Sequence, residues 1–73
     1  MTKITNKQLE KFFEDIAIKY GFRTPELSEI RDLIELLKID SLDRAEKLAK
    51  ILYEEELIKL PEDEIINIVK GRV

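Results

Sequence analysis

A serine flanked by carboxylates is the part of this sequence best suited to chemistry: the run Asp40-Ser41-Leu42-Asp43. A serine hydroxyl acts as a catalytic nucleophile when a base beside it takes its proton. The chain contains no His and no Cys, which excludes Ser-His-Asp and Cys-His pairs and zinc sites built on those residues. The simplest interpretation of the run is a helix start, in which Asp40 or Ser41 accepts a backbone N–H and Asp43 lies in the electropositive first turn.

The remaining carboxylates predict a solvated surface rather than acid-base catalysis. Most of them lie at salt-bridge spacing, i,i+3 or i,i+4, from a Lys or Arg on a predicted helix surface, which favours ion pairs along one helix. No acidic stretch has the spacing of a twelve-residue calcium loop. We therefore expect no enzymatic activity and no metal site. The predicted pairs are Asp15–Lys19, Asp43–Lys47, Glu46–Lys50 and Lys50–Glu54.

The composition is typical of one small globular domain spanning residues 1–73. Hydrophobic residues make up 44% of the chain and charged residues 40%. The net charge of −3, from 13 basic and 16 acidic residues, argues against a general nucleic-acid binder. No apolar run resembles a signal peptide or a membrane span, so we expect a protein with no membrane partner. The lack of Cys is compatible with a cytoplasmic location.

Apolar residues recur at helical spacing between a few Gly and Pro residues, which predicts an all-α fold: a small four-helix bundle. The first helix is expected over about Asn6–Tyr20, with Thr5 or Asn6 as its cap and Gly21 at its end. The second is expected over Pro25–Lys38, with Thr24 as its cap. Their predicted inward faces are Leu9, Phe12, Phe13, Ile16 and Tyr20, then Leu27, Ile30, Leu33, Ile34 and Leu37.

Two further helices follow a short break at Ile39-Asp40-Ser41. The third begins at this break, and its two inner alanines allow a neighbouring helix to approach closely. The fourth is expected over about Pro61–Lys70, with three acidic residues in its first turn, where the helix dipole favours them. The predicted inward faces are Ala45, Leu48, Ala49 and Leu52, then Ile65, Ile68 and Val69, with Ile66 at the boundary.

The flanks of Ser41 match a known sequence frame. Residues 33–43 read aliphatic-aliphatic-acid, then Leu-Leu-Lys-Ile, then Asp-Ser-Leu-Asp; Tyr20-Gly21-Phe22 occupies an earlier turn, and Leu60-Pro61-Glu62 a later Ile-Pro-Asp position. Over roughly residues 8–71 this pattern resembles the acyl carrier protein family. The chain departs from the family at Lys38, where the family has Gly, in a helix where the family has a long loop, and in a shortened C-terminal part.

The resemblance implies that a separate transferase attaches 4′-phosphopantetheine to Ser41, and that the chain then carries acyl or related groups as thioesters on this arm. By the same resemblance, Asp40 helps the transferase to hold magnesium, and Leu42 and Ile39 are apolar contacts around the arm. The helix after the serine is the family's docking surface for partner enzymes, which adds Asp43 and Glu46. The cargo, and whether the pathway makes fatty acids, polyketides or peptides, stays open.

Two other functions remain open at this point. In a non-enzymatic helical interaction module, Ser41 is only a cap and apolar side chains contact a partner helix. In a helical nucleic-acid-binding domain, a basic strip on the third helix faces phosphates, although the interleaved acids oppose this. The candidate residues are Leu57, Ile58 and Ile66 for the first function, and Arg44, Lys47 and Lys50 for the second.

Overall fold

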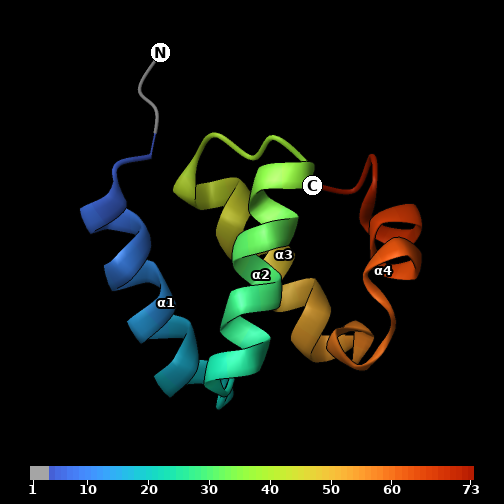
Figure 1. Ribbon diagram of the computed structural model, residues 1–73, viewed down its shortest axis with the longest axis horizontal. Helices are drawn as coiled ribbons and strands as arrows, with labels where there is room; N and C mark the ends of the chain where they lie inside the picture. Colours follow the sequence, from blue (N-terminus) through green and yellow to red (C-terminus); the bar gives the residue numbers. More distant parts are fainter. Residues whose placement is uncertain (1–3) are drawn as a thin grey trace.

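The structure, a computed structural model, describes residues 4–73 of the chain. Within these residues every regular element is a helix, which confirms the predicted all-α, four-helix bundle (Figure 1). None of these helices is long and apolar enough to cross a membrane. The elements are α1 (Asn6–Tyr20), α2 (Thr24–Leu36), α3 (Leu42–Glu54), the short 3-10 helix η1 (Leu57–Lys59) and α4 (Glu62–Val69).

Helix α1 begins and ends as the sequence predicts. Thr5 is its N-cap: its hydroxyl accepts from the backbone N–H of Gln8 at 3.2 Å, and the Gln8 side chain accepts from the Thr5 backbone N–H at 2.9 Å. This reciprocal pair is a capping box. At the other end Gly21 adopts the left-handed conformation, with φ 75°, which a residue without Cβ enters at no steric cost.

Helix α2 differs from its predicted bounds at both ends. Thr24 is its first residue rather than its cap, because the chain is already extended at Arg23, whose backbone N–H donates to Glu26 at 2.8 Å. The helix ends at Leu36, and Lys38 has a φ of 55°. This left-handed residue reverses the chain and lets the backbone N–H of Ile39 donate to the Ile34 carbonyl at 3.0 Å.

The core is centred on α3, whose inner face is fully buried as predicted: Ala45, Leu48, Ala49 and Leu52 are all 0% exposed. Helix α1 and η1 pack against α3, and α4 packs against α2. Phe22, Ile39 and Leu57, which lie in or beside the connections, are also buried and join the helices into one core.

The predicted inward face of α4 is wrong at one residue. Ile65 and Val69, four residues apart, are 0% exposed, whereas Ile68 is 37% exposed. A helix of eight residues has little more than two turns, so one narrow stripe reaches the core. Ile66 is half-buried beside that stripe, which agrees with its predicted position at the boundary.

Candidate functional site

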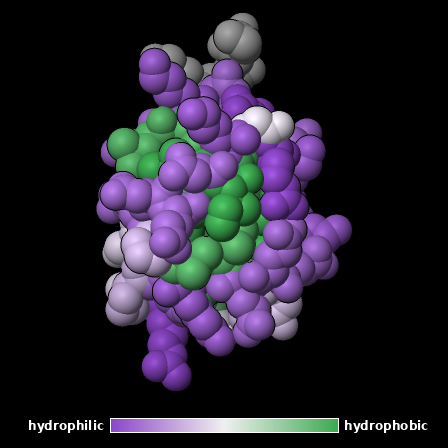
Figure 2. Space-filling model, turned by 90° about the vertical axis from the view of Figure 1, so that its right-hand side faces the viewer, coloured by the Kyte–Doolittle hydropathy of each residue, from purple (hydrophilic) through white to green (hydrophobic). Residues whose placement is uncertain are grey.

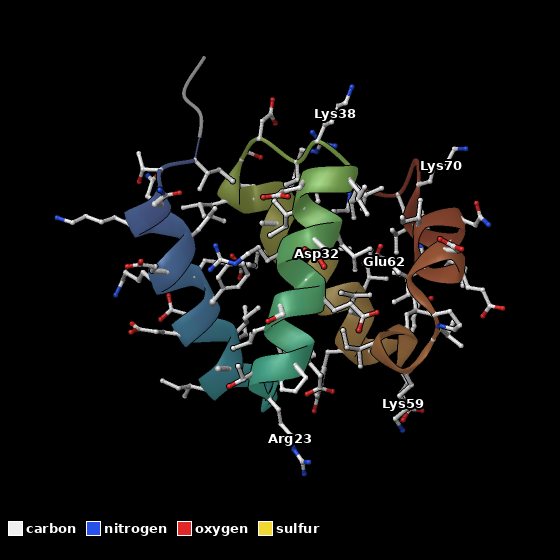
Figure 3. The ribbon with its side chains drawn as sticks, in the orientation of Figure 1. Arg23, Asp32, Lys38, Lys59, Glu62 and Lys70 are labelled. Atoms are coloured by element: carbon white, nitrogen blue, oxygen red, sulfur yellow. The ribbon has the colours of Figure 1, made fainter. Side chains whose placement is uncertain are left out.

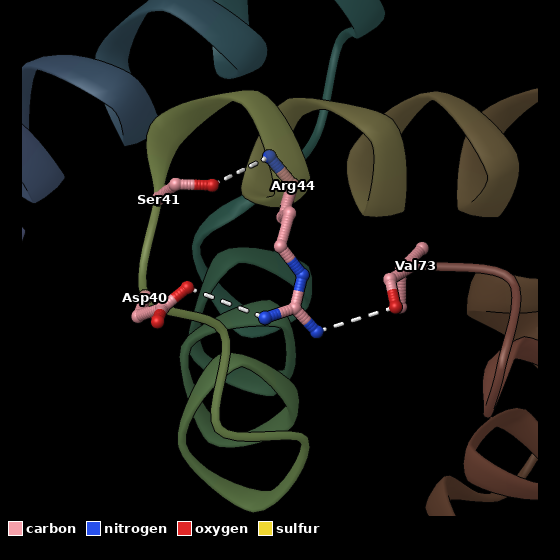
Figure 4. Close-up of polar contacts among 4 residues, drawn as sticks. All are labelled: Asp40, Ser41, Arg44 and Val73. Atoms are coloured by element: carbon pink, nitrogen blue, oxygen red, sulfur yellow. Dashed lines mark hydrogen bonds and ion pairs between the residues drawn. The ribbon is translucent and has the colours of Figure 1, made fainter.

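Ser41 is the N-cap of α3, and its side chain is only lightly engaged. Its backbone is extended, with φ −140° and ψ 152°, and its Oγ accepts from the backbone N–H of Arg44 at 3.3 Å (Figure 4). The residue is half-buried, between the exposed Asp40 and the partly exposed Leu42. The prediction that Asp40 or Ser41 caps this helix is therefore confirmed, with Ser41 as the cap.

Arg44 connects this helix start to the last residue of the chain. Its Nη1 donates to Asp40 Oδ1 at 3.3 Å and its Nη2 donates to the Val73 carbonyl oxygen at 3.2 Å. Figure 4 shows the guanidinium directed away from Ser41, between Asp40 and Val73. The i,i+4 spacing of Asp40 and Arg44 indicates that they can form an ion pair. Nothing in the sequence indicates the contact of Arg44 with Val73.

A second ion pair ties the same C-terminal segment to the far end of α3. The Arg72 guanidinium pairs through both terminal nitrogens with the carboxylate of Glu55, the residue that follows α3. The hydrogen bond from Arg72 holds the pKa of Glu55 below its ordinary value. The segment that ends at Val73 is thus held near both ends of α3, and one of its two attachments is next to Ser41.

Three of the predicted docking residues lie at the surface and one does not. Leu42 is 36% exposed, and Asp43 and Glu46 are exposed on the same helix. Ile39 is only 7% exposed, because the left-handed turn at Lys38 directs the chain back into the core. Its side chain packs inside the bundle and is not presented to a partner.

The ion pairs on α1 and α3 also differ from the prediction. Glu46 pairs with Lys19 of α1 across the helix interface at 3.5 Å, and not with a residue of its own helix. Both side chains are more than half exposed, so an ion pair of Glu46 with Lys19 and one with Lys50 would be similarly weak. The packing of α1 on α3 brings Lys19 close to Glu46 and so selects the pair between helices. None of the four predicted i,i+4 pairs is among the ion pairs of residues 4–73, which are Lys19–Glu46, Asp40–Arg44, Glu56–Lys59 and Glu55–Arg72.

Two recesses are lined by the sequence neighbours of Ser41, one by Asp40 and the other by Leu42. One, of about 580 Å³, runs between α1 and the end of α2 and reaches Asp40. The other, of about 200 Å³, lies between α1 and α3 and is lined by Phe12 and Leu42 among polar residues. The larger recess has an apolar lining of Ile4, Leu9, Ile34 and Ile39, and polar residues Glu35, Lys38 and Asp40.

Acidic residues face one another where α2 meets α4. Burial raises the pKa of Glu29, and the charges of Glu62, Asp32 and Glu26 raise it further. Figure 3 shows Asp32 on α2 and Glu62 at the start of α4. No group of three or more carboxylates within residues 4–73 is arranged to hold a metal ion.

An apolar area occupies the face of the molecule on the α4 side, bordered by polar side chains (Figure 2). Helix α4 contributes exposed Ile68 and half-buried Ile66 to the surface. Of the residues considered for an interaction module, Leu57 is only 7% exposed and serves as core, while Ile58 is half-buried. For the basic strip, Lys47 and Lys50 are exposed, but Arg44 is engaged with Asp40 and Val73.

No protein-family model, curated protein or solved structure matches this chain. The fold also has a 13-residue helix, α2, at the position where the acyl carrier pattern has a long loop, as the sequence predicts. Between Pro61 and Val73 it has one helix, α4.

Proposed function

We propose that this chain is an acyl carrier protein that bears a 4′-phosphopantetheine arm on Ser41. The observation that carries the proposal is the position of Ser41 as a half-buried cap with one accepted hydrogen bond, next to Asp40, which lines an apolar recess. In this role the chain is not an enzyme. It is the substrate of a phosphopantetheinyl transferase and a partner of acyl-transferring enzymes, and the proposal includes a cytoplasmic location.

The geometry at Ser41 suits the attachment reaction. Its Oγ accepts one hydrogen bond, which leaves the O–H proton free to move to a base of the transferase. Oγ then bonds to the β-phosphorus of coenzyme A as the bond to the bridging oxygen breaks, and adenosine 3′,5′-diphosphate leaves. The new phosphodiester lies at the N-terminus of α3, where the helix dipole and the free backbone N–H groups favour negative charge.

Asp40 is the residue that, by the resemblance, helps to hold the transferase's magnesium ion. Its carboxylate is 49% exposed and pairs with Arg44 at 3.3 Å. An exposed ion pair of this kind contributes only about 0–1 kcal/mol, so exchanging Arg44 for a metal ion costs little. Asp40 is therefore compatible with the role that the proposal gives it.

The arm supplies a terminal thiol that holds the acyl group as a thioester, and the chain supplies the surfaces around it. The recess between α1 and α2 offers an apolar lining that ends at the residue before Ser41. Exposed Leu42, Asp43 and Glu46 offer partner enzymes a mixed apolar and acidic surface. Ile39 is not part of this docking surface, because it is buried.

The test is a labelling reaction with a promiscuous phosphopantetheinyl transferase, magnesium and fluorescent coenzyme A. The chain has two serines, Ser41 and Ser28, and Ser28 is exposed on α2, which makes Ser28→Ala a matched control. We expect wild type and Ser28→Ala to carry the fluorescent label and Ser41→Ala to remain unlabelled. Label that persists in folded Ser41→Ala, or no label in wild type, contradicts the proposal.

The apolar area on the α4 side favours a second function, a non-enzymatic interaction module (Figure 2). In this function Ser41 serves only as a cap, and the exposed part of α4, including Ile68, contacts another helix. It predicts a mass that rises with concentration in light scattering, and a return to monomer in Ile68→Lys. A strictly monomeric wild type that accepts the arm favours the carrier instead.

A further inference from the structure

Three aromatic rings meet at the end of the bundle opposite Ser41. Tyr20 and Phe22 flank Gly21 after α1, and Tyr53 lies in the last turn of α3. The ring centroids are 4.8 Å apart for Tyr20 and Tyr53, 5.7 Å for Tyr20 and Phe22, and 6.4 Å for Phe22 and Tyr53. Phe22 is 7% exposed and Tyr53 is 50% exposed, so the cluster extends from the core to the surface.

The rings line a pocket of about 190 Å³ whose lining also includes Glu26 and Glu56, and Glu26 Oε1 accepts from the Arg23 backbone N–H at 2.8 Å. Lys59 is the one basic residue in its lining, and its Nζ is 3.1 Å from Glu56 Oε1. These two side chains are 74% and 73% exposed, so water screens the pair and another cation can replace the lysine at little cost. Figure 3 shows Lys59 and Arg23 at the lower end of the molecule in that view.

Two of the three helix ends at this end of the bundle present backbone carbonyl groups. Helices α1 and α3 both finish here, and the carbonyl ends of helices favour cations (Figure 1). Helix α2 begins here, but Glu26 in its first turn offsets the positive end of that dipole. Glu56 itself has a left-handed φ of 55°, where Gly is the residue with least strain, and its carboxylate is nevertheless at the pocket.

One ring of the cluster already contacts a cation of the same chain. The Lys19 ammonium lies 5.3 Å from the centroid of the Tyr20 ring, within the range of a cation–π interaction. Tyr53 offers a second, half-exposed ring beside two carboxylates. Aromatic faces combined with carboxylates are the chemistry that selects alkylated ammonium groups over neutral molecules of the same shape.

We propose that this pocket binds a small organic cation with a methylated ammonium group, of the choline type. The half-exposed Tyr53 ring contacts the methyl groups, and Glu26 and Glu56 balance the charge. This site lies at the opposite end of α3 from Ser41, so cation binding here does not depend on the carrier function.

Intrinsic fluorescence gives a direct test, because the chain has two Tyr and no Trp, and both tyrosines line the pocket. Wild-type protein is titrated with choline chloride at constant ionic strength, and in parallel with the uncharged carbon isostere of choline. We expect a saturable change in tyrosine emission with choline and none with the neutral isostere. No change with choline, or an equal change with the isostere, overturns the proposal without any variant being needed.

Two variants then assign the site. Glu56→Gln removes one charge, and Tyr53→Leu removes the exposed ring while keeping an apolar side chain. Each is expected to weaken choline binding roughly two- to fivefold, whereas Glu14→Gln on α1, which is remote from the pocket, leaves it unchanged. Circular dichroism confirms that each variant is folded. Unchanged affinity in both folded pocket variants contradicts the proposal.

Discussion

Helices α1 and α3 both begin with a hydroxyl cap, but only the cap of α1 is complete. Thr5 accepts from the Gln8 backbone, and the Gln8 side chain accepts in return from the Thr5 backbone. Ser41 accepts from the Arg44 backbone at 3.3 Å, and nothing comes back, because a guanidinium has donors and no acceptor. The difference between the two caps lies in the third residue after the cap, which is Gln8 in α1 and Arg44 in α3.

This difference shows what holds α3 in place. The Arg44 side chain turns to Asp40 and Val73 and so fastens the C-terminal segment instead of closing the cap. The helix depends on its fully buried inner face, and less on its first turn. The hydroxyls of both caps accept one backbone N–H each, so the two helix starts differ in the bond to the cap backbone and not in the bond to the cap hydroxyl.

The largest effect is expected from the core beneath both helices. Leu48 is 0% exposed at the centre of α3, so Leu48→Ala leaves a cavity and should cost about 2–5 kcal/mol, a large part of the stability of a small domain. Urea denaturation followed by circular dichroism measures this loss. Leu36→Ala is the matched control, since Leu36 is 56% exposed and should lose little. Equal losses in the two variants would show that the inner face of α3 is wrongly assigned.

A smaller effect is expected at the cap of α3. Ser41→Ala removes the acceptor for one backbone N–H and should cost about 1 kcal/mol. Ser28→Ala, on the exposed side of α2, removes a hydroxyl without a cap and should be neutral or slightly stabilising. A cost above that of Leu48→Ala would mean that the hydroxyl is essential to the fold and not free for modification.

The two caps should also differ in coupling. A double-mutant cycle with Ala at Thr5 and Gln8 should give an interaction energy of about 0.5 kcal/mol, because the two side chains act in one capping box. The same cycle at Ser41 and Arg44 should be additive, because the Arg44 side chain bonds to Asp40 and Val73 and makes no return bond to Ser41. Equal coupling at the two helix starts would refute the comparison.

The smallest effect is expected where acidic α2 faces acidic α4. Burial raises the pKa of Glu29 above its ordinary value of 4.5, so ionised Glu29 destabilises the fold. Protonated Glu29 contributes to the free energy of unfolding at a pH below that ordinary value. This contribution is lost as the pH rises through the raised pKa of the folded state. Glu29→Gln should therefore raise the thermal midpoint at pH 7, with the gain disappearing in acid. A gain that persists in acid, or an equal gain in exposed Glu14→Gln, contradicts this explanation.

The sequence was sufficient for the helices and for most of the core, because apolar spacing and Gly21 are local signals. The sequence was insufficient where a side chain had two possible partners and tertiary packing selected one of them. Glu46 has Lys50 at the expected spacing on its own helix, but α1 brings Lys19 within 3.5 Å. Thr24 has the chemistry of a cap, but the helix includes it because Glu26 reaches back to Arg23.

The candidate site was predictable in part for the same reason. The cap at Ser41 follows from local sequence, and so does the exposure of Asp40. The burial of Ile39 depends on a left-handed Lys38, a conformation that the residue type does not indicate. The aromatic pocket joins residues 33 positions apart, Tyr20 and Tyr53, which no local pattern connects.

The central claim is that the Ser41 hydroxyl is free to receive a group from another enzyme. Intact mass spectrometry of the wild-type chain, after reaction with transferase, magnesium and coenzyme A, tests it most directly. The expected result is a mass increase of one phosphopantetheine arm, with peptide mapping placing that arm on Ser41. A chain whose mass stays unchanged, while a known carrier in the same tube is fully converted, would contradict the claim.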